Sequence, residues 1–163
     1  MSIMNDFVVT VEQILPKNIA IFVLGMVPLI ELKGAIPLGI SLGLNVIDSL
    51  IYSFFGSLVP CPIILFLVNS ALEKLKKNHK LEIYINLLEK RLFRKGKNIK
   101  NLGLIGLLIF VAVPLPGTGV WSGSLIAGLF KLDNKLALLI ISIGNLIAGF
   151  IVTLITIGVI KII

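Results

Sequence analysis

The stretch VPLIELKGAIP, residues 27–37, places an acid and a lysine inside an otherwise apolar run. The apolar pieces on either side of Glu31–Gly34 are about 14 and about 10 residues long, so as helices they reach roughly 20 and 15 Å. A bilayer core is about 30 Å thick, and neither piece spans it alone. Together they form either one broken span or a hairpin that enters and returns. Both arrangements place Glu31 and Lys33 deep in the membrane, where a charge costs about 3 kcal/mol.

The composition is that of an integral membrane protein. The chain has 163 residues, of which 57% are hydrophobic and 14% charged, whereas soluble domains average about 25% charged residues. Residues 73–100 hold eight Lys and two Arg against three Glu, which equals the net charge of the whole chain, +7. Basic loops between spans mark the cytoplasmic side of a membrane. We therefore place residues 73–100 in the cytoplasm and expect no nucleic-acid partner.

Apolar runs and helix-breaking residues divide this single membrane domain into segments. Pro60 and Pro62 predict a kink in the first full span. We expect Asp48 and Asp133 to cap the two full spans, and Asn145 to bond a neighbouring helix. The segments are an interfacial amphipathic helix (1–16), a broken segment (17–44), a full span (49–72), the basic linker (73–100) with an amphipathic helix over 81–92, a second broken segment (102–131) and a second full span (136–160).

The two halves of the chain resemble each other. Val-Pro-Leu occurs at 27–29 and again at 113–115, and a Gly-Leu pair precedes an Asp turn in both halves. Small residues recur every four positions after each break, which lets helices approach closely. They are Ala35, Gly39 and Gly43 in the first half and Gly119, Gly123 and Ala127 in the second.

Two topologies fit this pattern. If both broken segments cross the membrane, the protein has four plain transmembrane helices. If both are re-entrant hairpins, each half crosses once and the halves form inverted repeats. Lys131 and Lys135 then lie inside and the acidic N-terminus outside, which favours the hairpins. We expect an all-α fold of this kind, with the two turns facing each other near mid-membrane, as in secondary transporters.

Candidate site residues cluster in the two broken segments. An apolar site favours the neutral form of the Glu31 carboxyl, which suits a proton or cation site. The alternatives are an ion pair with Lys33 or a cap for the next half-helix. The second turn exposes backbone at the positive end of a half-helix, suited to an anionic group. The predicted substrate- or proton-binding residues are Pro28, Glu31, Lys33, Pro37, Pro114, Pro116, Gly117, Thr118, Gly119, Trp121 and Ser122.

Other chemistry finds no support in the sequence. It contains no paired His for a metal, no nucleophile elbow and no ATP-binding P-loop. His79 is the only histidine and lies in the basic linker. We therefore expect no enzyme activity, no cofactor and no metal, and any transport is driven by a gradient or is passive.

The motifs PLIELKGAIP (28–37) and PLPGTGVWSG (114–123) resemble those of the family described as putative small multi-drug export proteins. The resemblance extends over about residues 19–160 and implies a small prokaryotic inner-membrane protein that exports a substrate. A more distant resemblance is to DedA-like proteins, whose two facing re-entrant hairpins imply lipid translocation. Their P-G-x-R motif matches residues 116–119, except that Gly119 replaces the arginine that clamps phosphate.

We predict a gradient-driven small transporter or exporter with Glu31 as its proton or cation site. A DedA-like lipid translocase or scramblase is the first alternative. A structural membrane protein without transport is the second. Expected partners are membrane lipids and a small-molecule or lipid substrate, and the small bundle makes a homodimer plausible.

Overall fold

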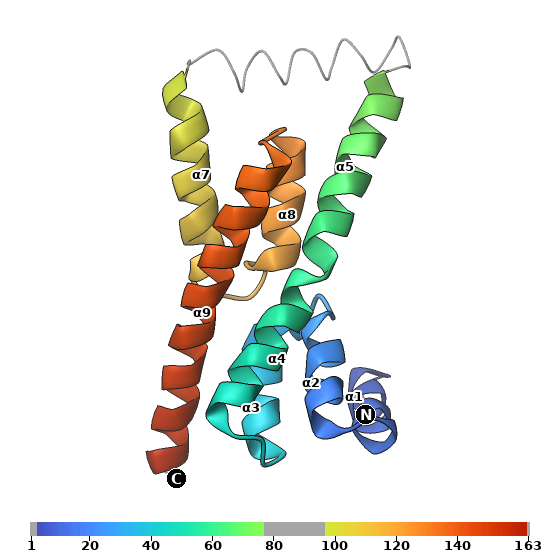
Figure 1. Ribbon diagram of the computed structural model, residues 1–163, viewed down its shortest axis with the longest axis vertical. Helices are drawn as coiled ribbons and strands as arrows, with labels where there is room; N and C mark the ends of the chain where they lie inside the picture. The colour runs from blue at the N-terminus through green and yellow to red at the C-terminus, as the bar shows by residue number, and fades with distance from the viewer. Residues whose placement is uncertain (1–2, 77–96, 163) are drawn as a thin grey trace. The chain divides into compact units, whose positions relative to one another are not determined.

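The computed structural model describes residues 3–76 and 97–162, and these residues are helical apart from the turns between helices. The amphipathic helix predicted over 81–92, with most of the basic linker, lies outside the described residues. In chain order the helices in Figure 1 are α1 (Ile3–Ile14), α2 (Lys17–Gly25), α3 (Glu31–Ser41), α4 (Val46–Leu58), α5 (Pro60–Lys76), α7 (Lys97–Ala112), α8 (Val120–Leu129) and α9 (Asn134–Ile162).

Within residues 3–76 and 97–162, two stretches of helix are long and apolar enough to cross a membrane. They are Val46–Lys74, which comprises α4 and α5, and Asn134–Val159 in α9. Many of their solvent-accessible side chains are large and apolar, including Phe55, Phe66 and Phe150. Such surfaces on a single chain are those of a protein surrounded by lipid. The described part of the chain is therefore all-helical, with two candidate membrane-spanning helices.

Proline determines where the first long helix is interrupted. α4 ends at Leu58 and α5 begins at Pro60. Proline has no N–H to donate, so it is tolerated at the first position of a helix but not in its interior. The kink predicted from Pro60 and Pro62 falls at this interruption, and Pro62 lies in the first turn of α5.

The chain folds as two compact units. The first comprises Met1–Val59 and Asn145–Ile163, and the second Pro60–Gly144. Each unit therefore contains one pair of short helices, the first part of one long helix and the last part of the other. The short pairs are α2 with α3 and α7 with α8, and in each pair the two helices contact each other.

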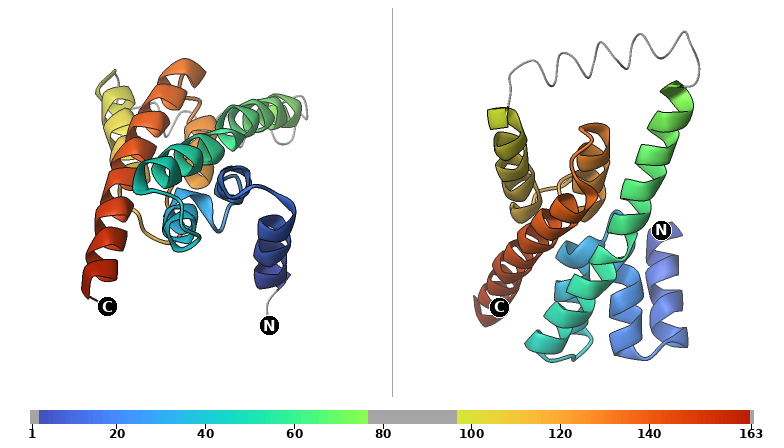
Figure 2. Two further views of the ribbon diagram at one scale, coloured as in Figure 1. Left: turned by 60° about the horizontal axis from the view of Figure 1, so that its bottom comes forward. Right: turned by 45° about the horizontal axis from the view of Figure 1, so that its top comes forward.

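In the first unit α4 packs against both α2 and α3, and α1 packs along α2 (Figure 2). Glycine makes the closest approach possible. A Cβ atom on Gly56 of α4 would lie 2.1 Å from the carbonyl oxygen of Phe22 in α2. The last part of α9 adds Ala148 and Val152 to a buried cluster with Leu32 and Ile36 of α3.

In the second unit α8 packs against α5 and α7. A Cβ atom on Gly128 would lie 2.7 Å from Cγ1 of Val68, and one on Gly123 would lie 2.6 Å from Cγ2 of Val111. Gly144, on the first part of α9, lies against the same Val111. The small residues after the second break therefore do allow close helix packing, as their spacing predicts.

The N-termini of the two long helices are capped by different types of residue. Asp133 accepts hydrogen bonds from the backbone N–H groups of Lys135 and Leu136 at 3.1 and 3.0 Å, so its predicted capping role is confirmed. The prediction for Asp48 is wrong. The cap is Asn45, whose side-chain oxygen accepts from the Asp48 N–H at 2.7 Å, while the Asp48 carboxylate accepts from the Asn45 amide at 2.6 Å.

Candidate functional site

The first turn is a break between two helices too short to span a membrane. α2 has 9 residues and α3 has 11, so they reach about 14 and about 17 Å. α2 ends at Gly25, and the N–H groups of Met26 and Val27 then bond carbonyls three residues back. Pro28 follows, and a proline disfavours helical backbone in the residue before it. The chain re-enters helix at Glu31.

Glu31 sits in an unusual backbone conformation. Its φ is +45°, in the left-handed region that costs a residue with a side chain about 1–2 kcal/mol. Only 4% of its surface is exposed. Strained backbone of this kind persists where the surrounding structure holds it, and it is concentrated at functional sites.

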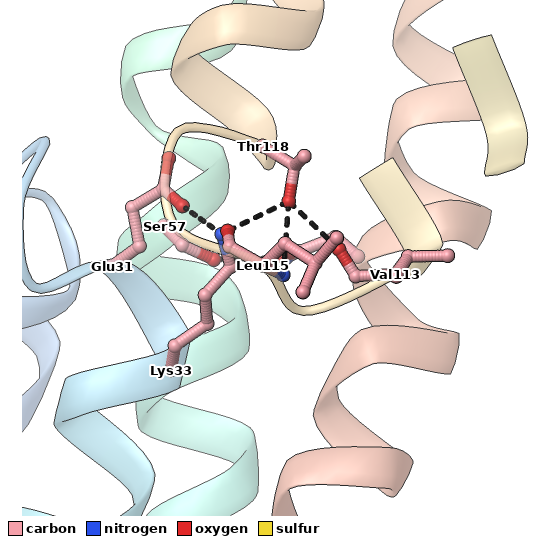
Figure 3. Close-up of polar contacts among 7 residues, drawn as sticks. Glu31, Lys33, Ser57, Val113, Leu115 and Thr118 are labelled. Atoms are coloured by element: carbon pink, nitrogen blue, oxygen red, sulfur yellow. Dashed lines mark hydrogen bonds and ion pairs between the residues drawn. The ribbon is translucent and has the colours of Figure 1, made fainter. Parts of the chain in front are cut away.

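An ion pair joins Glu31 to Lys33, with Lys33 Nζ 3.4 Å from Glu31 Oε2 (Figure 3). Residues two apart on a regular helix point to different sides and do not meet. The left-handed backbone at Glu31 turns its side chain out of the helical register and makes this pair possible. The ion pair weighed as an alternative from the sequence therefore exists, and it is compatible with either role for Glu31.

Glu31 also stands at the start of α3, where a negative charge is favourable to the helix dipole. The first turn of α3 has no side-chain cap hydrogen bond at its N-cap residue, Ile30. Further along, Pro37 lies inside α3. A proline there removes the helical hydrogen bond to the carbonyl of Lys33, which loosens the backbone directly beyond the charged pair.

The second turn, residues 113–119, is closed by one threonine. The Thr118 hydroxyl oxygen lies 2.7 Å from the Val113 carbonyl oxygen and 2.8 Å from that of Leu115, and it accepts from the Leu115 N–H at 3.2 Å (Figure 3). Gly117 and Gly119 have φ of +82° and +124°, which only glycine adopts readily. Thr118 and these glycines therefore build the turn itself.

The N-terminus of α8 opens directly from this turn. Its N-cap is Gly119, which has no side chain to bond the first N–H groups. Trp121 and Ser122, in the first turn of α8, are partly buried. Pro116 is exposed and Pro114 partly buried. This end of the helix carries the positive end of its dipole, as the sequence predicts.

The predicted site residues fall into both units. Pro28, Glu31, Lys33 and Pro37 belong to the first, and the other seven to the second. A cavity of about 280 Å³ opens at the far end of the α2–α3 pair, lined by Val9, Gln13, Lys17, Ala20 and Leu42. None of the predicted residues lines it.

One polar contact of the first unit was not predicted. The side-chain amide of Asn145 in α9 donates a 2.8 Å hydrogen bond to Ser57 Oγ in α4, and both residues are fully buried. The role of Asn145 in joining helices is thereby confirmed, but its partner lies 88 positions away in sequence. The signal for that partner is the serine repeated every four residues on α4, at 49, 53 and 57.

The model of one protein family, putative small multi-drug export protein, matches residues 31–151. The chain belongs to this family. The match begins at Glu31, the first residue of α3, and includes the whole second motif, whereas the first turn, residues 26–30, precedes it. The family name describes export across a membrane, in agreement with the apolar helices. No curated protein and no solved structure matches the chain.

Proposed function

We propose that this chain is a gradient-driven exporter of small molecules in which Glu31 binds the coupling proton or cation. The observation that carries the proposal is the Glu31 side chain itself. It is a carboxylate, 4% exposed, at a helix break in a membrane protein of an export family. An ionisable group at such a position costs free energy that a purely structural role does not require.

The chemistry follows from the pair with Lys33. In the charged state the two side chains attract each other across 3.4 Å. Protonation of Glu31, or binding of a cation to it, removes that attraction. The strained backbone of Glu31 can then relax to a helical φ, because this change no longer breaks an ion pair. Binding of the coupling ion is in this way linked to the conformation of the turn.

The proposal includes the re-entrant topology. α2, α3, α7 and α8 are all shorter than the roughly 20 residues a span requires. The two units also consist of the same kinds of part, which favours the repeat inferred from the sequence. That the two turns face one shared path at mid-membrane rests on this repeat and stays a prediction.

The test is export of ethidium, a fluorescent hydrophobic cation, from proteoliposomes with an imposed proton or sodium gradient. We expect Glu31→Gln to abolish gradient-driven export, and the exposed Glu73→Gln to leave it unchanged. The exchange of both charges, Glu31→Lys with Lys33→Glu, separates the two roles of the pair. It preserves an ion pair but moves the carboxylate, so we expect a folded protein that does not transport.

Three results would contradict the proposal. Full gradient-driven export by the Glu31→Gln variant would show that Glu31 is not the coupling site. Rescue of export by the double exchange would reduce the pair to a structural contact. Lipid scrambling that is insensitive to either gradient, with no ethidium export, would favour a lipid translocase instead.

A further inference from the structure

Hydroxyl groups on the apolar helices of this protein usually bond their own helix. Ser124, Ser142 and Thr156 each donate to the carbonyl four residues earlier, at 2.7, 2.7 and 2.8 Å. This is the ordinary way in which serine and threonine satisfy their hydroxyl inside a membrane helix.

Four buried polar atoms of the first unit depart from this pattern. They have no hydrogen-bond partner among residues 3–76 and 97–162, although the residues that carry them are at most 7% exposed. A buried polar group without a partner costs about 1–3 kcal/mol. The atoms are Ser49 Oγ, Ser53 Oγ, Asn145 Oδ1 and Thr153 Oγ1.

The hydrogen-bond arithmetic fixes the orientation of Asn145. Ser57 has one hydroxyl hydrogen, and it is donated to the Phe54 carbonyl at 2.9 Å. Ser57 Oγ therefore accepts from the amide, so the nitrogen of Asn145 faces it at 2.8 Å. The amide oxygen is then the atom left over, a buried acceptor with no donor in the described part of the chain.

The α4 backbone at Ser53 and Ser57 lies against the end of α2, whereas Ser49 Oγ lies against Gly39 of α3. A Cβ atom on Gly25, the last residue of α2, would lie 3.1 Å from the Ser53 carbonyl oxygen and 3.3 Å from the Ser57 nitrogen. The C-terminal end of a helix carries a partial negative charge. At this end of α2 the carbonyls of Val23 and Leu24 accept from the N–H groups of Met26 and Val27. Ser57 and Glu31 both appear in the close-up of Figure 3. Glu31 is the first charged residue that follows α2 in the sequence.

We propose that Ser53, Ser57, Asn145 and the C-terminal end of α2, together called the Asn145 cluster, bind a sodium ion. The inference goes beyond the proposed function, because this cluster is a cation site that does not include Glu31. Amide, hydroxyl and carbonyl oxygens are the ligands that Na⁺ takes at the ends of broken helices in transporters. Neutral oxygens suit a monovalent cation, because a divalent ion in lipid needs carboxylates to offset its desolvation.

The test is the thermal unfolding temperature of the full chain in detergent, in NaCl, KCl or choline chloride at equal ionic strength. We expect a saturable, sodium-specific rise of about 5 °C at a Na⁺ concentration of about 100 Kd. Asn145→Ala and Ser53→Ala should each lose most of that rise. Ser142→Ala is the matched control, because the Ser142 hydroxyl is satisfied within its own helix, and it should keep the full rise.

An equal unfolding temperature of the wild-type chain in all three salts would overturn the inference. Buried water would then be the hydrogen-bond partner of the four polar atoms. A full sodium response in Asn145→Ala would overturn it as well. If Asn145→Ala does not fold, Ser53→Ala decides. The outcome is separable from the export test: proton-driven export in sodium-free buffer, together with no sodium response, would refute the cluster alone.

Discussion

The contact between α2 and α4 predicts a large effect from the smallest possible substitution, Gly56→Ala. The added methyl carbon would lie 2.1 Å from the carbonyl oxygen of Phe22 and 2.9 Å from its carbonyl carbon. Carbon–oxygen contacts in proteins come no closer than about 3.3 Å, so the two helices must separate by about 1 Å. The obstacle is backbone on both sides, which no rotamer change relieves. The same separation would displace the C-terminal end of α2 and the turn that carries Glu31.

Overpacking a close-packed interior usually costs 1–3 kcal/mol. Because backbone meets backbone here, we expect Gly56→Ala to lower the free energy of unfolding by about 3 kcal/mol. The control is Gly158→Ala in α9, where a Cβ meets nothing within 4 Å and helix propensity alone favours alanine by up to about 1 kcal/mol. Unfolding in mixed micelles with a denaturing detergent, followed by circular dichroism, measures both. Stabilities of the two variants within about 0.5 kcal/mol of each other would refute the packing described here.

Substitutions at three further positions test the turns and caps by the same unfolding measurement. Thr118→Val should cost about 1 kcal/mol, because the hydroxyl that bonds the Val113 and Leu115 carbonyls is lost, whereas Thr118→Ser keeps the hydroxyl and should cost less; equal losses would refute the hydrogen-bonded turn. Asp133→Ala should cost about 1 kcal/mol through the lost α9 cap, and no change would contradict that cap. Glu31→Gly should be more stable than Glu31→Ala by about 1 kcal/mol, because glycine tolerates the left-handed φ; the reverse order would place Glu31 in ordinary helix.

The helix breaks were predictable because residues close in sequence determine them. Pro28, Pro60 and the Pro114–Gly119 run remove backbone donors or favour positive φ, and these effects need no tertiary contact. The same holds for the Asp133 cap. The Asn45 cap was missed although it is also local, because Asn45 and Asp48 both have capping side chains and only the structure shows which one accepts from the helix.

The site was predictable only in part. An acid in an apolar run marks Glu31 as a candidate without any structure. No local rule gives its left-handed backbone or its pairing with Lys33. The Asn145–Ser57 bond joins residues 88 positions apart, and a single sequence contains no signal for such a pair beyond the spacing of the serines.

The re-entrant topology is the claim on which the transport proposal depends most directly. It is tested by the side of the membrane on which a reporter fused after Ile163 is active, compared with one inserted in the basic linker, residues 73–100. A hairpin over 102–131 leaves one crossing between linker and C-terminus, so the account predicts the linker reporter inside and the C-terminal reporter outside. Both reporters inside would mean that the second half crosses twice, and would contradict the inverted repeat and the mid-membrane turn on which the role of Glu31 is built.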